Sequence, residues 1–99
     1  MSESTDNIAA SLHARIETYR ADLIESPPSP SNFDYLLRLF HGAQALIAYG
    51  DEAQLWSPSA ARAAFARLDL AWSPHRAAEE RRRWPALSAA GLAGAGGGA

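Results

Sequence analysis

Two Trp-Ser-Pro triplets, at residues 56–58 and 72–74, constrain the fold of this chain more than any other feature. Serine is a favoured N-cap, and proline fits the first helical position because the amide that it lacks has no partner there. The tryptophan before each serine occupies the position just before the N-cap, from which an apolar residue can pack against the first turn as a hydrophobic staple. The triplets therefore predict one helix from about 57 to 70 and another from about 73 to Trp84, where Pro85 ends it.

The first quarter of the chain predicts another helix. Apolar residues from Ile8 to Leu23 recur every three or four positions, and Thr5 or Asp6 can cap the helix that they define. The residues before the cap are expected to fray. A proline-rich connector at 26–31 cannot continue the helix, because each proline lacks a donor and restricts the residue before it.

The next helix is expected from an approximate capping box, Ser31 with Asp34, to the natural stop at Gly50. Residues 51–56 are either a separate turn or an extension of this helix past Gly50. The helix is apolar nearly all round, with one narrow polar stripe through Asp34, Arg38 and His41. Two short neighbours are not expected to cover so much apolar surface, so we expect a homodimer or a partner protein.

Composition restricts the class of protein. Apolar residues make up 47% of the 99 residues, enough for one small domain over residues 1–85. Without cysteine there is no disulfide, zinc finger or cysteine nucleophile. The acidic N-terminus does not resemble a signal peptide, and no apolar run is long enough to cross a membrane. We expect a cytoplasmic protein with a disordered Gly/Ala tail at 86–99.

These patterns predict an all-α fold. It consists of three main helices in a small bundle plus a charged, peripheral C-terminal helix, with no strands, since valine is absent and no run alternates. The expected core residues are Leu12, Ile16, Tyr19, Leu23, Phe33, Leu36, Leu37, Phe40, Ile47, Phe65 and Leu68.

Candidate catalytic and metal-binding residues are sparse. His13 with Glu17, and His75 with Glu79, stand four apart on a helix, but a metal site needs three or four ligands. The stripe through His41 is better explained as the solvated edge of a helix than as a buried acid–base group. No activated nucleophile and no phosphate-binding loop is present. We therefore expect no enzymatic activity, cofactor, metal or small-molecule substrate.

The C-terminal helix holds the best candidates for partner binding, because tryptophan and arginine are enriched at binding hot spots. Its candidate residues are Trp72, Arg76, Arg81, Arg82, Arg83 and Trp84. Direct binding of nucleic acid is disfavoured. Consecutive arginines on a helix point about 100° apart, Glu79 and Glu80 offset part of their charge, and the whole chain carries a net charge of −2.

Charge is distributed unevenly along the chain. Eight acids and three arginines precede Ser57, whereas six arginines and three acids follow Trp56. Such asymmetry marks either a surface that faces a partner or two halves that attract each other.

Three functions remain open. The first is a non-catalytic protein-interaction module, such as an accessory subunit or a regulator. The second is a nucleic-acid-binding protein that uses the Arg/Trp-rich helix. The third is a precursor or substrate whose Gly/Ala tail is processed.

Overall fold

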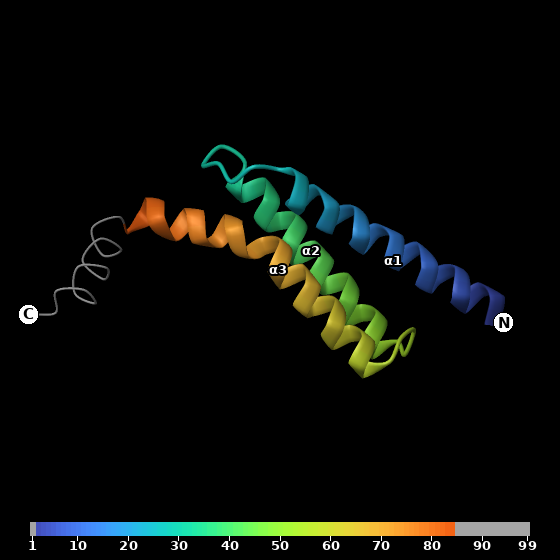
Figure 1. Cartoon of the computed structure of the whole chain (residues 1–99). Coiled ribbons are helices and arrows are strands. Elements are labelled where there is room, and N and C mark those ends of the chain that lie inside the picture. Colours follow the sequence, from blue (N-terminus) through green and yellow to red (C-terminus); the bar gives the residue numbers. More distant parts are fainter. Residues whose placement is uncertain (1, 85–99) are drawn as a thin grey trace, which may run out of the picture.

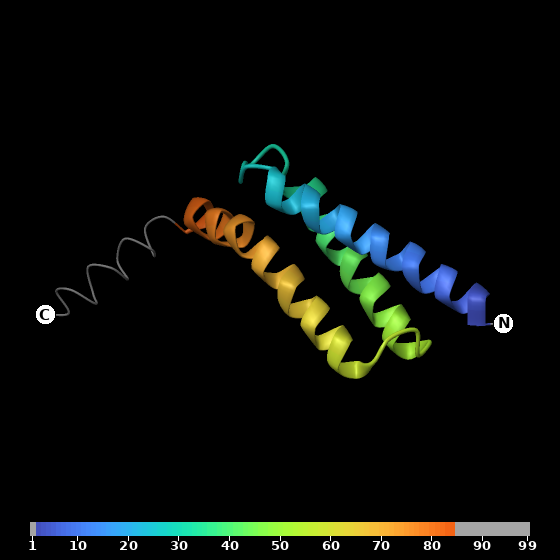
Figure 2. The ribbon, with the colours of Figure 1, turned by 45° about the vertical axis from the view of Figure 1, so that its right-hand side comes forward.

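The computed structural model describes residues 2–84 as an all-α bundle. It contains α1 (Ser2–Glu25), α2 (Phe33–Glu52) and α3 (Pro58–Arg83), and this part of the chain has no strand. Figure 1 shows α2 between α1 and α3, and the turned view of Figure 2 agrees. The predicted small all-α bundle is confirmed. The tail predicted at 86–99 lies outside the described residues.

The last helix differs from the sequence prediction. Residues 58–83 form one helix that runs through Pro74, so the separate start predicted at Ser73 is wrong. The Ser73 hydroxyl does not cap a new helix; it donates to the Asp69 carbonyl one turn back, at 2.8 Å. Pro74 leaves the carbonyl four residues earlier without its helical donor, and Figures 1 and 2 show the axis of α3 changing direction as its colour turns from gold to orange.

The start of α3 follows the predicted device. Ser57 is the N-cap, its hydroxyl accepts from the Ala60 amide at 3.1 Å, and Pro58 occupies the first turn. Trp56 lies against α2, where its indole Nε1 donates to the Ile47 carbonyl at 3.3 Å. The first Trp-Ser-Pro triplet therefore both starts α3 and ties it to α2.

The remaining helix ends contain three corrections. Helix α1 begins at Ser2, so the cap predicted at Thr5 or Asp6 is wrong. The N-cap of α2 is Asn32, which makes no side-chain capping bond, so the capping box predicted at Ser31 is wrong. Helix α2 passes Gly50 and ends at Glu52, so the stop predicted at Gly50 is wrong. Of residues 51–56, the first two extend the helix and the other four form a turn.

The core lies where α1 and α3 meet α2. Six of the expected core residues are fully buried, and four more, Tyr19, Phe33, Leu37 and Phe65, pack against them while partly exposed. Leu12 is only half-buried. Trp72 and the alanines Ala43, Ala61 and Ala71 are core residues that were not among those expected. The buried hydrophobic residues are Ile16, Leu23, Leu36, Phe40, Ala43, Ile47, Ala61, Leu68, Ala71 and Trp72.

An aromatic cluster joins α2 to the second half of α3. The Trp72 ring stacks on Phe40 with centroids 5.0 Å apart, and tilts against Phe33 at 5.3 Å. The His75 ring also stacks on Trp72, with centroids 5.6 Å apart. Burial of these rings on both sides of Pro74 explains why α3 continues, since it offsets the cost of an interior proline of about 3 kcal/mol.

His75 also completes the end of α1. It is 2% exposed, and its Nε2 lies 2.7 Å from the Leu23 carbonyl oxygen. That carbonyl would ordinarily accept from the amide four residues later, but position 27 is proline and has no N–H. Because a carbonyl only accepts, Nε2 carries the proton and donates. A side chain 52 positions away thus supplies the hydrogen bond that the connector cannot.

The glycines of α2 provide a matched stability test. A Cβ at Gly50 would lie 1.9 Å from Trp56 Cζ2, so Gly50→Ala must displace the indole. A Cβ at Gly42 would lie 3.4 Å from Tyr19 Cε2, an ordinary contact. We expect Gly50→Ala to lower the free energy of unfolding by about 2 kcal/mol, and Gly42→Ala to raise it by up to about 1 kcal/mol. Urea unfolding followed by circular dichroism measures both; equal effects would contradict this packing.

Replacing His75 tests the hydrogen bond to α1. His75→Ala removes a buried ring and leaves the Leu23 carbonyl unpaired, so we expect a loss of about 2–4 kcal/mol of stability. The matched control is His41→Ala on the exposed face of α2, with an expected change within about 0.5 kcal/mol. Chemical unfolding compares the two, and similar losses would show that His75 is not a structural donor.

Candidate partner-binding surface

Trp72 is the first of the predicted binding residues that the structure relocates. It is 4% exposed and belongs to the core. A partner cannot reach the ring while α3 is folded, so its assignment to a binding surface is wrong. The sequence placed it after the end of one helix, whereas the continuous α3 turns it inward beside Leu68 and His75.

The arginines at the end of α3 do not form a single basic face. Arg82 forms an ion pair with Glu79 three residues earlier. The Arg83 guanidinium lies 5.1 Å from the centroid of the Trp84 ring, and that ring is 49% exposed. Arg81, Arg82 and Arg83 occupy the last turn of α3, where cations interact favourably with the helix dipole. The ion pair with Glu79 and the interaction with the helix dipole therefore explain much of this arginine cluster without a partner.

Other candidate groups are separated or already paired. Asp34, Arg38 and His41 are all exposed, which confirms the solvated edge. His75 is used internally, as described above. Within residues 2–84, the acidic and histidine side chains make no group of three able to hold a metal.

The outer face of α2 is less apolar than its sequence suggests. Leu36, Phe40 and Ile47 are buried by α1 and α3, and the other leucines of α2 pack against the core. Its large exposed apolar residues are Tyr35 and Tyr49. Two neighbours thus do cover most of α2, which removes the reason to expect a dimer through this helix.

Two hollows lie between α1 and α3, which pack mainly on α2 and less on each other. The two hollows share Arg67 as a lining residue, and we name the surface that they make together the α1–α3 groove. It is lined from α1 by His13, Ile16, Glu17, Arg20 and Ile24, and from α3 and the preceding loop by Trp56, Ala60, Ala63, Ala64, Arg67, Leu70 and Ala71.

Helical periodicity aligns both walls of the groove. The α3 residues recur at steps of three and four from Ala60 through Arg67 to Ala71, and the α1 residues do so from His13 to Ile24. Residues at this spacing lie on one face of a helix. This line on α3 overlaps the core stripe only at Ala64 and Ala71, so the core pattern did not reveal it. Four of its members are alanine, so the wall is shallow.

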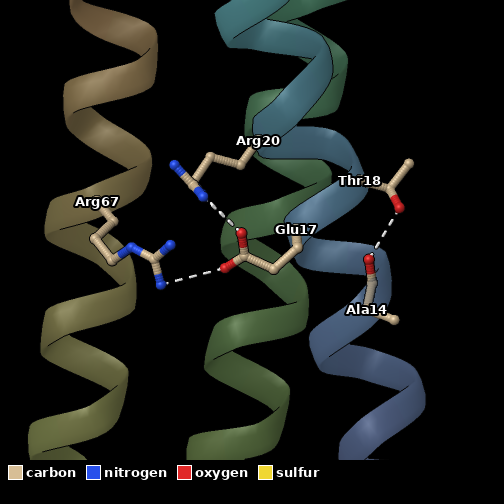
Figure 3. Close-up of polar contacts among 5 residues, drawn as sticks. All are labelled: Ala14, Glu17, Thr18, Arg20 and Arg67. Atoms are coloured by element: carbon tan, nitrogen blue, oxygen red, sulfur yellow. Dashed lines mark hydrogen bonds and ion pairs between the residues drawn. The ribbon is translucent and has the colours of Figure 1, made fainter.

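An ion-pair cluster crosses the middle of the groove (Figure 3). Glu17 Oε2 accepts from Arg20 Nε at 2.9 Å and from Arg20 Nη2 at 2.8 Å, while Glu17 Oε1 lies 3.3 Å from Arg67 Nη1 on α3. The hydrogen bonds from Arg20, with the charges of Arg20, Arg67 and His13, hold the pKa of Glu17 below its ordinary value of 4.5 and outweigh partial burial. This contact joins the acidic and basic halves of the chain.

Two large apolar side chains flank one end of the groove. Leu70 on α3 is 75% exposed, and Ile24 on α1 is 58% exposed. Both line the same hollow as Arg20, Arg67 and Ala71. Leu70 and Ile24 therefore leave apolar surface exposed in the α1–α3 groove, next to the charged Arg20 and Arg67. An exposed apolar patch rimmed by charge is typical of interaction sites.

No family model matches this chain, and comparisons with curated proteins and with solved structures find no similar protein. Separately, no helix within residues 2–84 is long and apolar enough to cross a lipid bilayer.

The Glu17 cluster predicts a pH-dependent contribution to stability. Its carboxylate has a lowered pKa in the folded state, so it stabilises the fold above the unfolded pKa, and this stabilisation is lost as the pH falls below 4.5 through the folded value. We expect Glu17→Gln to lower the free energy of unfolding by about 0.5–1 kcal/mol at pH 7. The gap to the wild type should close towards pH 3. Thermal unfolding across this range measures it, and a gap independent of pH would contradict the assignment.

Proposed function

We propose that this protein is a non-catalytic protein-interaction module, an accessory subunit or a regulator, that binds another protein in the α1–α3 groove. The observation that carries the proposal is the exposure of Leu70 and Ile24 on opposite walls of that groove. Burying one such side chain at an interface contributes about 1–2 kcal/mol. A partner that covers both gains binding energy without disturbing the core.

The polar residues of the groove support binding rather than acid–base chemistry. A general base needs a pKa near the working pH and an unoccupied lone pair facing its substrate. Glu17 instead has a lowered pKa, and both of its oxygens are engaged by guanidinium groups. The cluster thus supplies fixed charge to the surface.

Nucleic-acid binding by the end of α3 is the second candidate. It is favoured by the exposed Trp84 ring beside the Arg83 guanidinium, an arrangement that can stack a base and contact phosphate. It is weakened by the Arg82–Glu79 ion pair, which uses one of the three arginines.

Substitutions on each surface distinguish the two candidate functions. We expect Leu70→Glu to abolish partner binding and to change stability by less than about 0.5 kcal/mol, because the side chain is mostly in water. Tyr49→Glu, at an exposed apolar residue on α2, is the matched control and should keep binding. A triple variant with alanine at Arg81, Arg83 and Trp84 tests the other surface.

The measurement is affinity capture of the native partner with each variant, followed by titration calorimetry with that purified partner. Loss of the same partner with Leu70→Glu alone supports the groove. Loss of partner binding with the triple variant alone would place the binding site at the end of α3 instead. A gel-shift with RNA or DNA at low salt, weakening steeply as salt rises, would instead favour the nucleic-acid candidate.

A further inference from the structure

The occupant of the α1–α3 groove can be specified further from its shape and charge; this step rests on the function proposed above. We infer that the groove takes an amphipathic α-helix of a different protein, with a carboxylate on its contacting face that binds Arg67. The apolar residues of that helix lie between Ile24 and Leu70 and over the alanines of α3.

The shape of the groove fits a helix. From Ala60 to Ala71 the α3 wall rises through eleven residues, or about 17 Å, which is three helical turns. Both walls are themselves helices, and α2 lies behind them (Figure 3). A fourth helix bound along the α1–α3 groove would complete a four-helix arrangement with α1, α2 and α3. The alanines permit close approach, because the distance between helix axes depends on side-chain size at the contact.

The charge of the groove selects an acidic occupant. Arg20 and Arg67 share the single carboxylate of Glu17, which leaves the cluster with an excess of positive charge. Arg20 is bound through two nitrogens, whereas Arg67 makes one longer contact and its side chain is 53% exposed. Arg67 therefore has donors left for a carboxylate, and a guanidinium can bind one through two parallel hydrogen bonds.

The same charge disfavours a second copy of this chain in the groove. In a symmetric dimer the same surface meets itself, so Arg67 and Arg20 would approach their own counterparts. Among residues 2–84, Glu17 is the one carboxylate that lines this groove, and Arg20 and Arg67 already engage it. A helix from a different protein avoids this repulsion and supplies the missing negative charge.

A display library of helices tests the inference while the natural partner is still unidentified. Its members are amphipathic helices of about 18 residues, long enough to span the groove, with leucine and alanine along one stripe. One central stripe position is Glu, Gln or Lys. The full-length protein is the bait, and the baits compared are the wild type, Arg67→Glu, Leu70→Glu and the control Tyr49→Glu. Circular dichroism verifies that each bait is folded.

We expect the wild type and Tyr49→Glu to enrich Glu over Lys by about fivefold. Arg67→Glu should reverse that preference, and Leu70→Glu should retain no helix. Reversal is a readout that a purely structural role of Arg67 would not produce.

Three outcomes would overturn the inference, each in a different way. Equal binding of Glu, Gln and Lys helices, still lost with Leu70→Glu, removes the carboxylate but keeps the groove as a helix-binding site. Failure of every helix to bind the folded wild type removes a helix as the occupant, whereas partner capture with Leu70→Glu decides the proposed function separately. A dimer in sedimentation that Leu70→Glu disrupts assigns the groove to a second copy of the chain.

Discussion

The hydrogen bond from His75 to the Leu23 carbonyl is the contact on which the rest of the arrangement depends. Pro27 stands four residues after Leu23, so the Leu23 carbonyl lacks its helical backbone donor. An unpaired buried carbonyl costs about 1–3 kcal/mol. His75 removes that cost and, in doing so, holds the part of α3 beyond Pro74 against α1. His75 thus pairs the carbonyl that lacks a helical hydrogen bond at the end of α1, and it directly follows Pro74, which causes the missing hydrogen bond inside α3.

This contact also explains why a groove exists. His75 joins α1 to α3 at one end, and the Glu17–Arg67 pair joins them at the middle. Between and beyond these contacts the facing residues of α3 are mostly alanines, which do not fill the space to α1. Most of the other large apolar residues of both helices belong to the core cluster that they share with α2. The result is two walls held at fixed separation, with Leu70 and Ile24 left in water and a positive cluster between them.

Sequence reasoning succeeded where a residue's role depends on its neighbours in the chain. The helical stripes, the connector, the Ser57 cap and most core residues follow from periodicity and local hydrogen bonding. It failed at the second Trp-Ser-Pro triplet, which is identical in its residues to the first. Trp56 lies over Gly50, whereas Trp72 is enclosed by Phe33, Phe40 and His75. No local pattern distinguishes these two surroundings. The groove was missed for the same reason, since its walls belong to different helices.

The sequence by itself therefore determined that the chain is helical, where its connectors lie and which faces are apolar, because these follow from interactions between residues close along the chain. Only the tertiary structure decided that α3 continues through Pro74, that Trp72 is a core residue and that the open surface lies between α1 and α3. These outcomes depend on contacts across the bundle. Burial of Trp72 and His75 outweighs the local preference of proline to start a helix, and that balance is set by residues on α1 and α2.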